Sequence, residues 1–245
     1  MDLQLFIIRL KKILFLLLNR KYLNIYLKFN TCPSVEHKHV ISSLFFNNLI
    51  DVGANNGQFS LLTNYLFPQK KIIAFEPLKQ CCDKYNLIFS ANKNIKCINV
   101  GLGSKKSTLK INITQSSDSS SFLRPNRVGS IFNEAIVLAS QNVNVLTGST
   151  MLSIFDLKGS LLKIDVQGYE LEVLKGFNYK IKYIKYIFIE LSHIELYRNQ
   201  PLFDEVLRYL EMRDFVPTTV SNQIFSSDRL IQADYLLINR KYIEN

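Results

Sequence analysis

The first candidate ligand-binding residues lie in the stretch 50–58, Ile-Asp-Val-Gly-Ala-Asn-Asn-Gly-Gln, which continues an apolar run. This stretch fits the pattern D-x-G-x-N-x-G, with the fixed positions held by Asp51, Gly53, Asn55 and Gly57. Glycine has no Cβ atom, and asparagine tolerates a left-handed backbone, so a ligand can closely approach the backbone of such a turn. The pattern therefore predicts a strand that ends in a ligand-binding turn.

The next apolar run, 71–75, ends in a second acidic residue, Glu76, which Pro77 follows. A carboxylate roughly 20 residues after a glycine turn can accept hydrogen bonds from both hydroxyls of a ribose. A dinucleotide turn needs G-x-G-x-x-G to approach a pyrophosphate, but Asn55 and Gln58 stand where its later glycines would be. Asp51 would repel a pyrophosphate and suits the ammonium and sulfonium end of S-adenosyl-L-methionine, so the two motifs together predict that cofactor.

Three candidate catalytic residues stand where later strands are expected to end. Asp165 could orient the methionine end of the cofactor, act as a base, ligate a cation, or cap the following helix. Glu190 lies inside an apolar run, where a carboxylate is costly unless it is paired or used. His193 follows three residues later, and a neutral imidazole suits a general base near pH 7. If a divalent cation takes part, Asp165 and Glu190 are its expected ligands.

Other polar residues have a structural interpretation beside the functional one. Glu170 could serve the site or place a negative charge at a helix N-terminus. His37 and His39 precede a short expected helix and are expected to be solvent-exposed. The serine-rich segment 116–121 could cover the acceptor or form plain surface.

These motifs resemble the signature blocks of the FkbM family of class I S-adenosylmethionine-dependent methyltransferases. The resemblance runs in order from about residue 40 to about residue 240, through 51–59, Phe75-Glu76-Pro77, 162–170 and Ile189-Glu190-Leu191. The block D-V-Q-G-Y-E-L-E-V-L-K-G is its most specific part. The resemblance implies O-methylation of a hydroxyl on a sugar, in a glycan, a lipid-linked saccharide or a related natural product.

Two other classes of function stay open. The net charge of +10 permits an RNA methyltransferase. The chain has no Asn-Pro-Pro-Tyr-like motif, no cysteine placed as a nucleophile and no basic stripe interleaved with aromatic residues, so nucleic acid is not the expected acceptor. A non-catalytic S-adenosylmethionine-binding module is the third class, but a scaffold has no need to keep the turn 51–57 and Glu76 intact.

The elements that must position these residues alternate between strands and helices. Strands are expected at 48–52, 71–75, 95–100, 107–113, 161–166, 186–190, 214–220 and 234–239, and the main helices at 58–67, 78–91, from 169, and at 202–212. Such alternation in 245 residues predicts one α/β domain, 36–245, with a doubly wound, mostly parallel Rossmann-like sheet of the class I methyltransferase type. Gly101 and Leu102 follow the third strand and are expected to contact the cofactor. The four cysteines lack metal spacing, which favours reduced thiols in the cytoplasm.

Residues 1–35 form a basic, amphipathic extension, with a helix expected over 3–29. Cations interrupt its apolar runs at Arg9, Lys11, Lys12, Arg20, Lys21 and Lys28. They oppose a spanning helix, which needs roughly 20 mainly apolar residues, and no small-residue cleavage site marks a signal peptide. Residues 1–29 could lie peripherally on the inner face of an anionic membrane, or pack on the domain or in a dimer. Nothing in the sequence predicts an oligomeric state.

Overall fold

The computed structural model describes residues 3–115, 117–126, 136–153 and 155–243, so Ser116 of the serine-rich segment lies outside it. Its centre is a seven-stranded sheet with the order β3-β2-β1-β7-β8-β10-β9. The strands are β1 (Leu49–Val52), β2 (Ile72–Phe75), β3 (Ile95–Ile98), β7 (Ser160–Ile164), β8 (Ile184–Ser192), β9 (Phe215–Ser226) and β10 (Arg229–Asn239). Neighbouring strands from β3 to β8 are parallel, and β10 runs antiparallel to both of its neighbours. The predicted doubly wound, mostly parallel sheet is confirmed.

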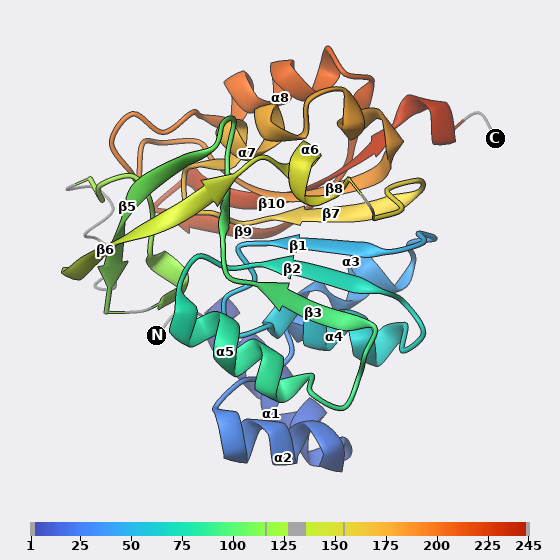
Figure 1. Ribbon diagram of the computed structural model, residues 1–245. Helices are drawn as coiled ribbons and strands as arrows, with labels where there is room; N and C mark the ends of the chain where they lie inside the picture. The colour runs from blue at the N-terminus through green and yellow to red at the C-terminus, as the bar shows by residue number, and fades with distance from the viewer. Residues whose placement is uncertain (1–2, 116, 127–135, 154, 244–245) are drawn as a thin grey trace.

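Helices cover both faces of this sheet (Figure 1). One face carries α3 (Lys38–Ser42), α4 (Gln58–Leu66) and α5 (Lys79–Ile88), and the other carries α6 (Gly148–Met151), α7 (Glu170–Phe177) and α8 (Phe203–Glu211). Successive side chains of a strand point to opposite faces, so Leu49 joins the first hydrophobic core and Ile50 the second. Both residues are fully buried. This two-sided packing explains why the central strands read as continuous apolar runs.

A second, three-stranded sheet stands beside the first and has the order β4-β6-β5. Its strands are β4 (Gly101–Leu102), β5 (Ser107–Thr114) and β6 (Val137–Leu146), and η2 (Ser117–Ser119) follows β5. The sequence predicts β5 from its alternation but does not predict β6, whose first six residues are all exposed. The small sheet matters because Gly101 and Leu102 of β4, Ile111 of β5 and the segment after β5 line a cavity beside the large sheet.

The N-terminal extension folds as two helices, α1 (Leu3–Leu18) and α2 (Arg20–Phe29), and not as the single helix expected over 3–29. The helices break at Asn19, whose side-chain amide donates to the Phe15 carbonyl. Phe15 and Tyr22 are buried, and both rings meet the ring of Tyr65 on α4 edge to face. Among the described residues, no helix is long and apolar enough to cross a membrane. The expected boundary at residue 35 falls where η1 (Val35–His37) begins.

Candidate active site and cofactor pocket

The turn after β1 has the left-handed backbone that its sequence predicts. Gly53, Asn55 and Gly57 have φ values of 72°, 46° and 92°. A Cβ atom on Gly53 would lie 1.8 Å from the backbone oxygen of Asp165, and one on Gly57 would lie 2.8 Å from the Tyr85 ring. Glycine is therefore required at both positions, by the close approach of β7 and by packing against α5.

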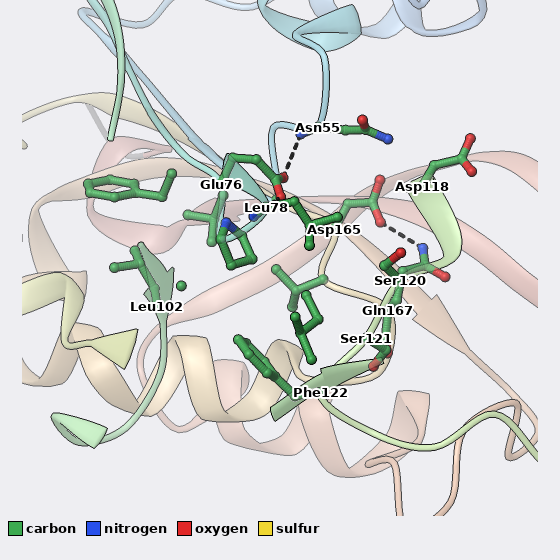
Figure 2. A pocket seen from close by; sticks show the side chains of 17 residues that line it. Asn55, Glu76, Leu78, Leu102, Asp118, Ser120, Ser121, Phe122, Asp165 and Gln167 are labelled. Atoms are coloured by element: carbon green, nitrogen blue, oxygen red, sulfur yellow. Dashed lines mark hydrogen bonds between the residues drawn. The ribbon is translucent and has the colours of Figure 1, made fainter. Parts of the chain in front are cut away.

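Glu76 sits at the end of β2, in the wall of a cavity that opens beside this turn (Figure 2). Its Oε2 accepts a hydrogen bond from the Asn55 backbone N–H and its Oε1 one from that of Leu78, both at 2.8 Å. Burial raises the pKa of Glu76 to about 7, against the opposing effect of these two N–H donors. The carboxylate thus ties the turn to β2 and can still accept ligand hydroxyls, since each oxygen has a second lone pair.

The remaining walls of this cavity are apolar on one side and polar on the other. Leu78, Leu102, Ile111 and Phe122 supply the apolar surface, and Gly101 also lines it. Asp118, Ser120 and Ser121 close it from the serine-rich segment, and Ser121 Oγ donates to the Gln167 carbonyl at 2.6 Å. A carboxylate beside an apolar slot suits the ribose and base of an adenosine group, and Gly101 and Leu102 both line this cavity.

A second cavity adjoins the first and shares Gly53, Asn55, Asp118 and Asp165 with it. Its lining is polar and comes from distant parts of the chain: Lys12, Glu36, His37, Lys163, Asp165, Glu190, Asn222 and Asp234 are among its residues. The first cavity lies against β1 and β2, whereas the second reaches across β7 to β8 and β10. We call it the polar cavity.

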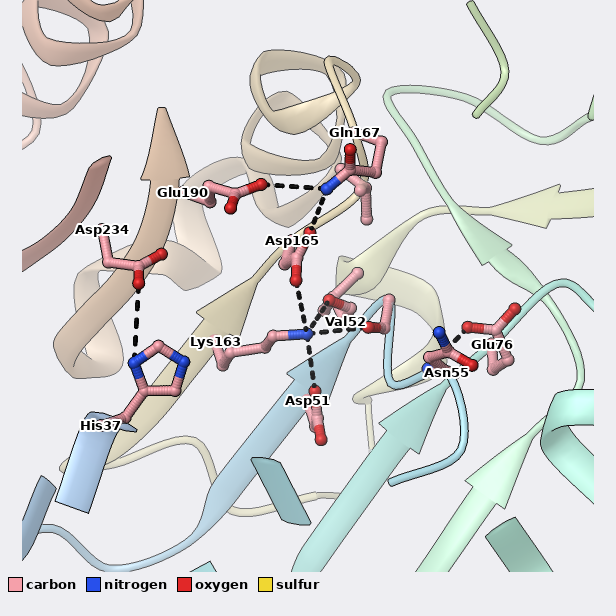
Figure 3. A network of polar contacts seen from close by, with 12 residues as sticks. His37, Asp51, Val52, Asn55, Glu76, Lys163, Asp165, Gln167, Glu190 and Asp234 are labelled. Atoms are coloured by element: carbon pink, nitrogen blue, oxygen red, sulfur yellow. Dashed lines mark hydrogen bonds and ion pairs between the residues drawn. The ribbon is translucent and has the colours of Figure 1, made fainter. Parts of the chain in front are cut away.

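Lys163, from β7, holds the glycine turn and two carboxylates together (Figure 3). Its Nζ donates to the Gly53 carbonyl at 2.7 Å and lies 3.3 Å from Asp51 Oδ1 and 3.7 Å from Asp165 Oδ2. Burial alone would lower the pKa of Lys163, but the Asp51 and Asp165 carboxylates raise it above its usual value. Lys163 is therefore a buried cation at the floor of the polar cavity. The sequence signal for this role is a lysine inside the apolar run L-L-K-I.

Asp51 is fully buried beneath the turn and lines neither cavity. Its Oδ2 accepts a 2.7 Å hydrogen bond from Ser60, whose Oγ in turn accepts one from Tyr85. The sequence led us to expect Asp51 to face the cofactor's ammonium and sulfonium groups. The structure instead gives it Lys163 and Ser60 as partners, so its effect on the cofactor passes through the turn. Gly57 likewise lines neither cavity, since it begins α4.

Asp165 and Glu190 are brought together at the polar cavity, as the strand order implies. The side-chain amide of Gln167 donates to Asp165 Oδ1 at 2.8 Å and to Glu190 Oε2 at 2.9 Å. Tyr197 donates to the Oε1 of Gln167 at 2.8 Å, which fixes the orientation of the amide. Burial, followed by the nearby Asp165 carboxylate, raises the pKa of Glu190 well above its usual value. Gln167, missed as a site residue, is the bridge between the two carboxyl groups.

The contacts of Glu170 favour a structural role over a role in the site. It is buried, and its Oε1 accepts hydrogen bonds from the backbone N–H groups of Val166 and Gly168 at 3.3 and 3.0 Å. These bonds shape the loop that carries Gln167, which has a φ of 55°.

His193 is not brought to either cavity. Its imidazole stacks on the Phe203 ring with centroids 4.7 Å apart, and its Nε2 lies 2.6 Å from the Tyr235 hydroxyl. This environment accounts for the residue by packing.

His37 is the histidine that the structure places at the polar cavity, and the expectation that it is solvent-exposed is wrong. Its side chain is only 13% exposed, because it packs against the rings of Phe59 and Phe188. Its Nδ1 lies 3.5 Å from Asp234 Oδ2 on β10, and neither atom has a hydrogen bond within the part of the chain that is described. His39 is exposed, as expected.

The titration of this pair differs from that of a surface ion pair. Burial lowers the pKa of His37 to about 4. Burial, followed by the Asp165 carboxylate, raises the pKa of Asp234 to about 8. Near neutral pH the contact therefore joins a neutral imidazole to a carboxyl group. Within the described residues, no three His, Cys, Asp or Glu side chains are grouped so that they could hold a metal ion.

Comparison with known proteins identifies the family. The profile of the methyltransferase FkbM domain matches residues 51–217, which hold the glycine turn, Glu76 and the Asp165–Gln167–Glu190 cluster. The chain belongs to the FkbM methyltransferase family. A curated relative, methyltransferase sdnD of Sordaria araneosa, is 29% identical over 190 residues, which cover 67% of this chain and 69% of the relative.

Solved structures resemble this methyltransferase at low sequence identity. Aeropyrum pernix fibrillarin with natively bound S-adenosyl-L-methionine is 10% identical, with a TM-score of 0.46 over 82% of this chain and 73% of fibrillarin. TehB from Haemophilus influenzae is 11% identical, with a TM-score of 0.48 over 89% of this chain and 67% of TehB.

This member of the FkbM family is an S-adenosyl-L-methionine-dependent methyltransferase, and its first cavity fits that cofactor. Gly53 and Asn55 of the glycine turn line this cavity, and Glu76 has lone pairs for ribose hydroxyls. Apolar side chains wall the opposite side.

Proposed function

We propose that this methyltransferase acts on a hydroxyl of a saccharide, in a glycan, a lipid-linked saccharide or a related natural product. The observation that carries the proposal is the polar cavity beside the cofactor pocket, with carboxyl groups from Glu36, Asp165, Glu190 and Asp234 in its lining. Carboxylates accept hydrogen bonds, and protonated carboxyl groups also donate them, so such a wall can bind several sugar hydroxyls at once. The same carboxyl groups would repel the phosphates of RNA, which disfavours a nucleic acid acceptor.

Asp165 and Glu190 are suited to orienting the acceptor, because both are already held by Gln167. Asp165 also stands between the two cavities, where it can contact the donor's methionine end. Fixing donor and acceptor in line can by itself lower the barrier by about 7–11 kcal/mol in well-oriented systems. Positioning is therefore the main task that the proposal gives to these two residues.

His37 is the residue that we assign as proton acceptor. When bound, S-adenosyl-L-methionine supplies a methyl group on a positively charged sulfur, and the electron pair of the broken carbon–sulfur bond stays on that sulfur. The acceptor oxygen forms the new bond to the methyl carbon and gives its proton to the imidazole of His37, which lines the polar cavity. Asp234, 3.5 Å from Nδ1, stabilises the imidazolium in its ionised form, which it reaches as pH rises through its raised pKa of about 8.

Methyl transfer from labelled cofactor to a panel of methyl glycosides, nucleotide sugars and lipid-linked glycans tests the proposal. We expect a methyl ether on a sugar hydroxyl, identified by mass spectrometry. Transfer only to RNA, or cofactor binding without transfer to any of these acceptors, would contradict it.

We place the enzyme in the cytoplasm, in peripheral contact with a membrane surface where lipid-linked saccharides are assembled.

A further inference from the structure

Helix α1 has two faces with different environments. Phe15 and Leu16 are buried against the domain, and Lys12 turns toward the polar cavity. The opposite face leaves seven large apolar side chains between 41% and 74% exposed: Phe6, Ile7, Leu10, Ile13, Leu14, Leu17 and Leu18. Because they recur every three or four residues, they form one continuous stripe along the helix. We call them the outer stripe.

The outer stripe is too long to be scattered surface apolar residues, which need no explanation when they occur singly. It runs through four turns of a 16-residue helix, and the following helix adds Leu27, which is 73% exposed. Exposure of these apolar side chains to water is energetically unfavourable. A contiguous patch of this kind indicates a binding surface.

The charges beside the outer stripe are all of one sign. Residues 3–35 contain no aspartate or glutamate. Lys12 pairs with Glu36 at 3.1 Å, whereas five cations of α1 and α2 are exposed: Arg9, Lys11, Arg20, Lys21 and Lys28. A surface with this composition is complementary to a partner that has an apolar region next to negative charges.

We propose that α1 and α2 dock on an anionic lipid bilayer, with the outer stripe in the boundary between headgroups and acyl chains. A bilayer of anionic lipids satisfies both features, because it buries the apolar side chains and attracts the flanking cations. A second copy of the chain would satisfy only the stripe, since it would bring ten like-charged side chains together (five from each copy). The helix lies in the plane of the membrane, because the cations Arg9 and Lys11 stand near its middle.

The docking helix is also part of the acceptor site. Lys12 of α1 and its partner Glu36 both line the polar cavity, on the side of the helix away from the outer stripe. A protein held on the membrane by α1 therefore keeps the polar cavity within one helix diameter of the headgroup layer, about 10–12 Å. Resting on the proposed function, this favours an acceptor saccharide that is attached to a lipid.

Vesicle sedimentation with the full-length protein tests the docking surface without any acceptor, so it can fail independently of the methyl transfer assay. We expect binding to vesicles of phosphatidylcholine mixed with phosphatidylglycerol, weaker binding to phosphatidylcholine alone, and release at high salt. The double variant Leu14→Gln, Leu17→Gln should lower the partition coefficient by at least roughly tenfold, because two exposed leucines no longer enter the bilayer. Arg9→Gln with Lys11→Gln should remove most of the preference for anionic vesicles.

The matched controls are Leu87→Gln, an exposed leucine on α5, and Lys93→Gln, an exposed lysine before β3. Both should bind vesicles as the wild-type protein does. All four substitution sets change exposed side chains, so circular dichroism should show unchanged folding. Absence of binding to anionic vesicles at low salt would overturn the inference. So would equal losses in the stripe and control variants, or a stripe-dependent dimer that persists in the presence of vesicles.

Discussion

Replacing Lys163 with methionine should destabilise the protein strongly, because it removes a buried cation and leaves its partners buried. Methionine keeps most of the volume and removes the charge. Asp51 is then left fully buried without its ion pair, and the Gly53 carbonyl loses the 2.7 Å hydrogen bond from Nζ. Removal of one partner from a buried ion pair costs about 3–5 kcal/mol, a large part of the roughly 5–15 kcal/mol of a typical domain.

Urea unfolding followed by circular dichroism measures this loss, and the chain offers a matched control. Lys175 pairs with Glu172 at 2.7 Å, but its side chain is 45% exposed, so Lys175→Met should cost no more than about 1 kcal/mol. Adding Asp51→Asn to Lys163→Met should recover part of the loss, since the unpaired charge is then removed. If Lys163→Met costs as little as Lys175→Met, or if the double variant is no more stable than the single one, the buried cation does not hold the turn.

The pH at which this contribution is lost follows from the direction of the shift. The pKa of Lys163 is raised by Asp51 and Asp165 above its usual value of 10.5. A raised lysine pKa stabilises the folded state fully below the unfolded pKa, and the contribution is lost as pH rises through the folded pKa. The difference between wild type and Lys163→Met should therefore be constant through neutral pH and shrink only in strongly alkaline solution.

Three further predictions concern binding and turnover. Glu76→Gln should weaken S-adenosyl-L-methionine binding by about 1.5–3 kcal/mol in calorimetry. The affinity of the wild-type protein for this cofactor should fall as pH drops below about 7, where Glu76 takes up a proton. A pH-independent affinity would contradict the ribose role. His37→Gln should lower kcat by about 10²–10⁴-fold with little change in cofactor affinity. The control His39→Gln, at an exposed histidine, should change neither quantity. The kcat of the wild-type protein should rise with pH through about 8, as Asp234 loses its proton. Asp165→Asn and Glu190→Gln should fold and bind cofactor but lose most turnover on a saccharide; near wild-type rates would make both residues structural.

The donor side of the site could be predicted from the sequence because it is local. The turn 51–57 and Glu76 lie within 26 residues, and their roles depend on a backbone conformation that glycine and asparagine indicate directly. Asp51 shows the limit of such reasoning. Its residue type suited a cationic ligand, but its partner is a lysine 112 residues away on β7, which only the pairing of β1 with β7 brings close.

The polar cavity could not be predicted, because it is assembled from residues that share no sequence pattern. Glu36 and His37 precede β1, Asp165 and Gln167 follow β7, and Asp234 lies on the antiparallel β10. His37 reads as a surface residue until the rings of Phe59 and Phe188 are seen around it. His193 reads as a site residue until its contacts with Phe203 and Tyr235 are seen. Burial decides both cases, and burial of a single histidine depends on tertiary contacts.

The strand order explains why these two halves differ. The cofactor cavity lies against β1 and β2, which follow each other along the chain, so its residues carry a compact motif. The polar cavity spreads over β7, β8 and β10 and is closed by α1 and η1, which lie at the other end of the sequence. Residues 1–50 lie outside the matched family domain, yet they supply Lys12, Glu36 and His37 to the polar cavity. Under the proposed function, acceptor selection would depend on a part of the chain that the family motif does not describe, and exchange of residues 1–50 between family members should change the acceptor while cofactor affinity is kept.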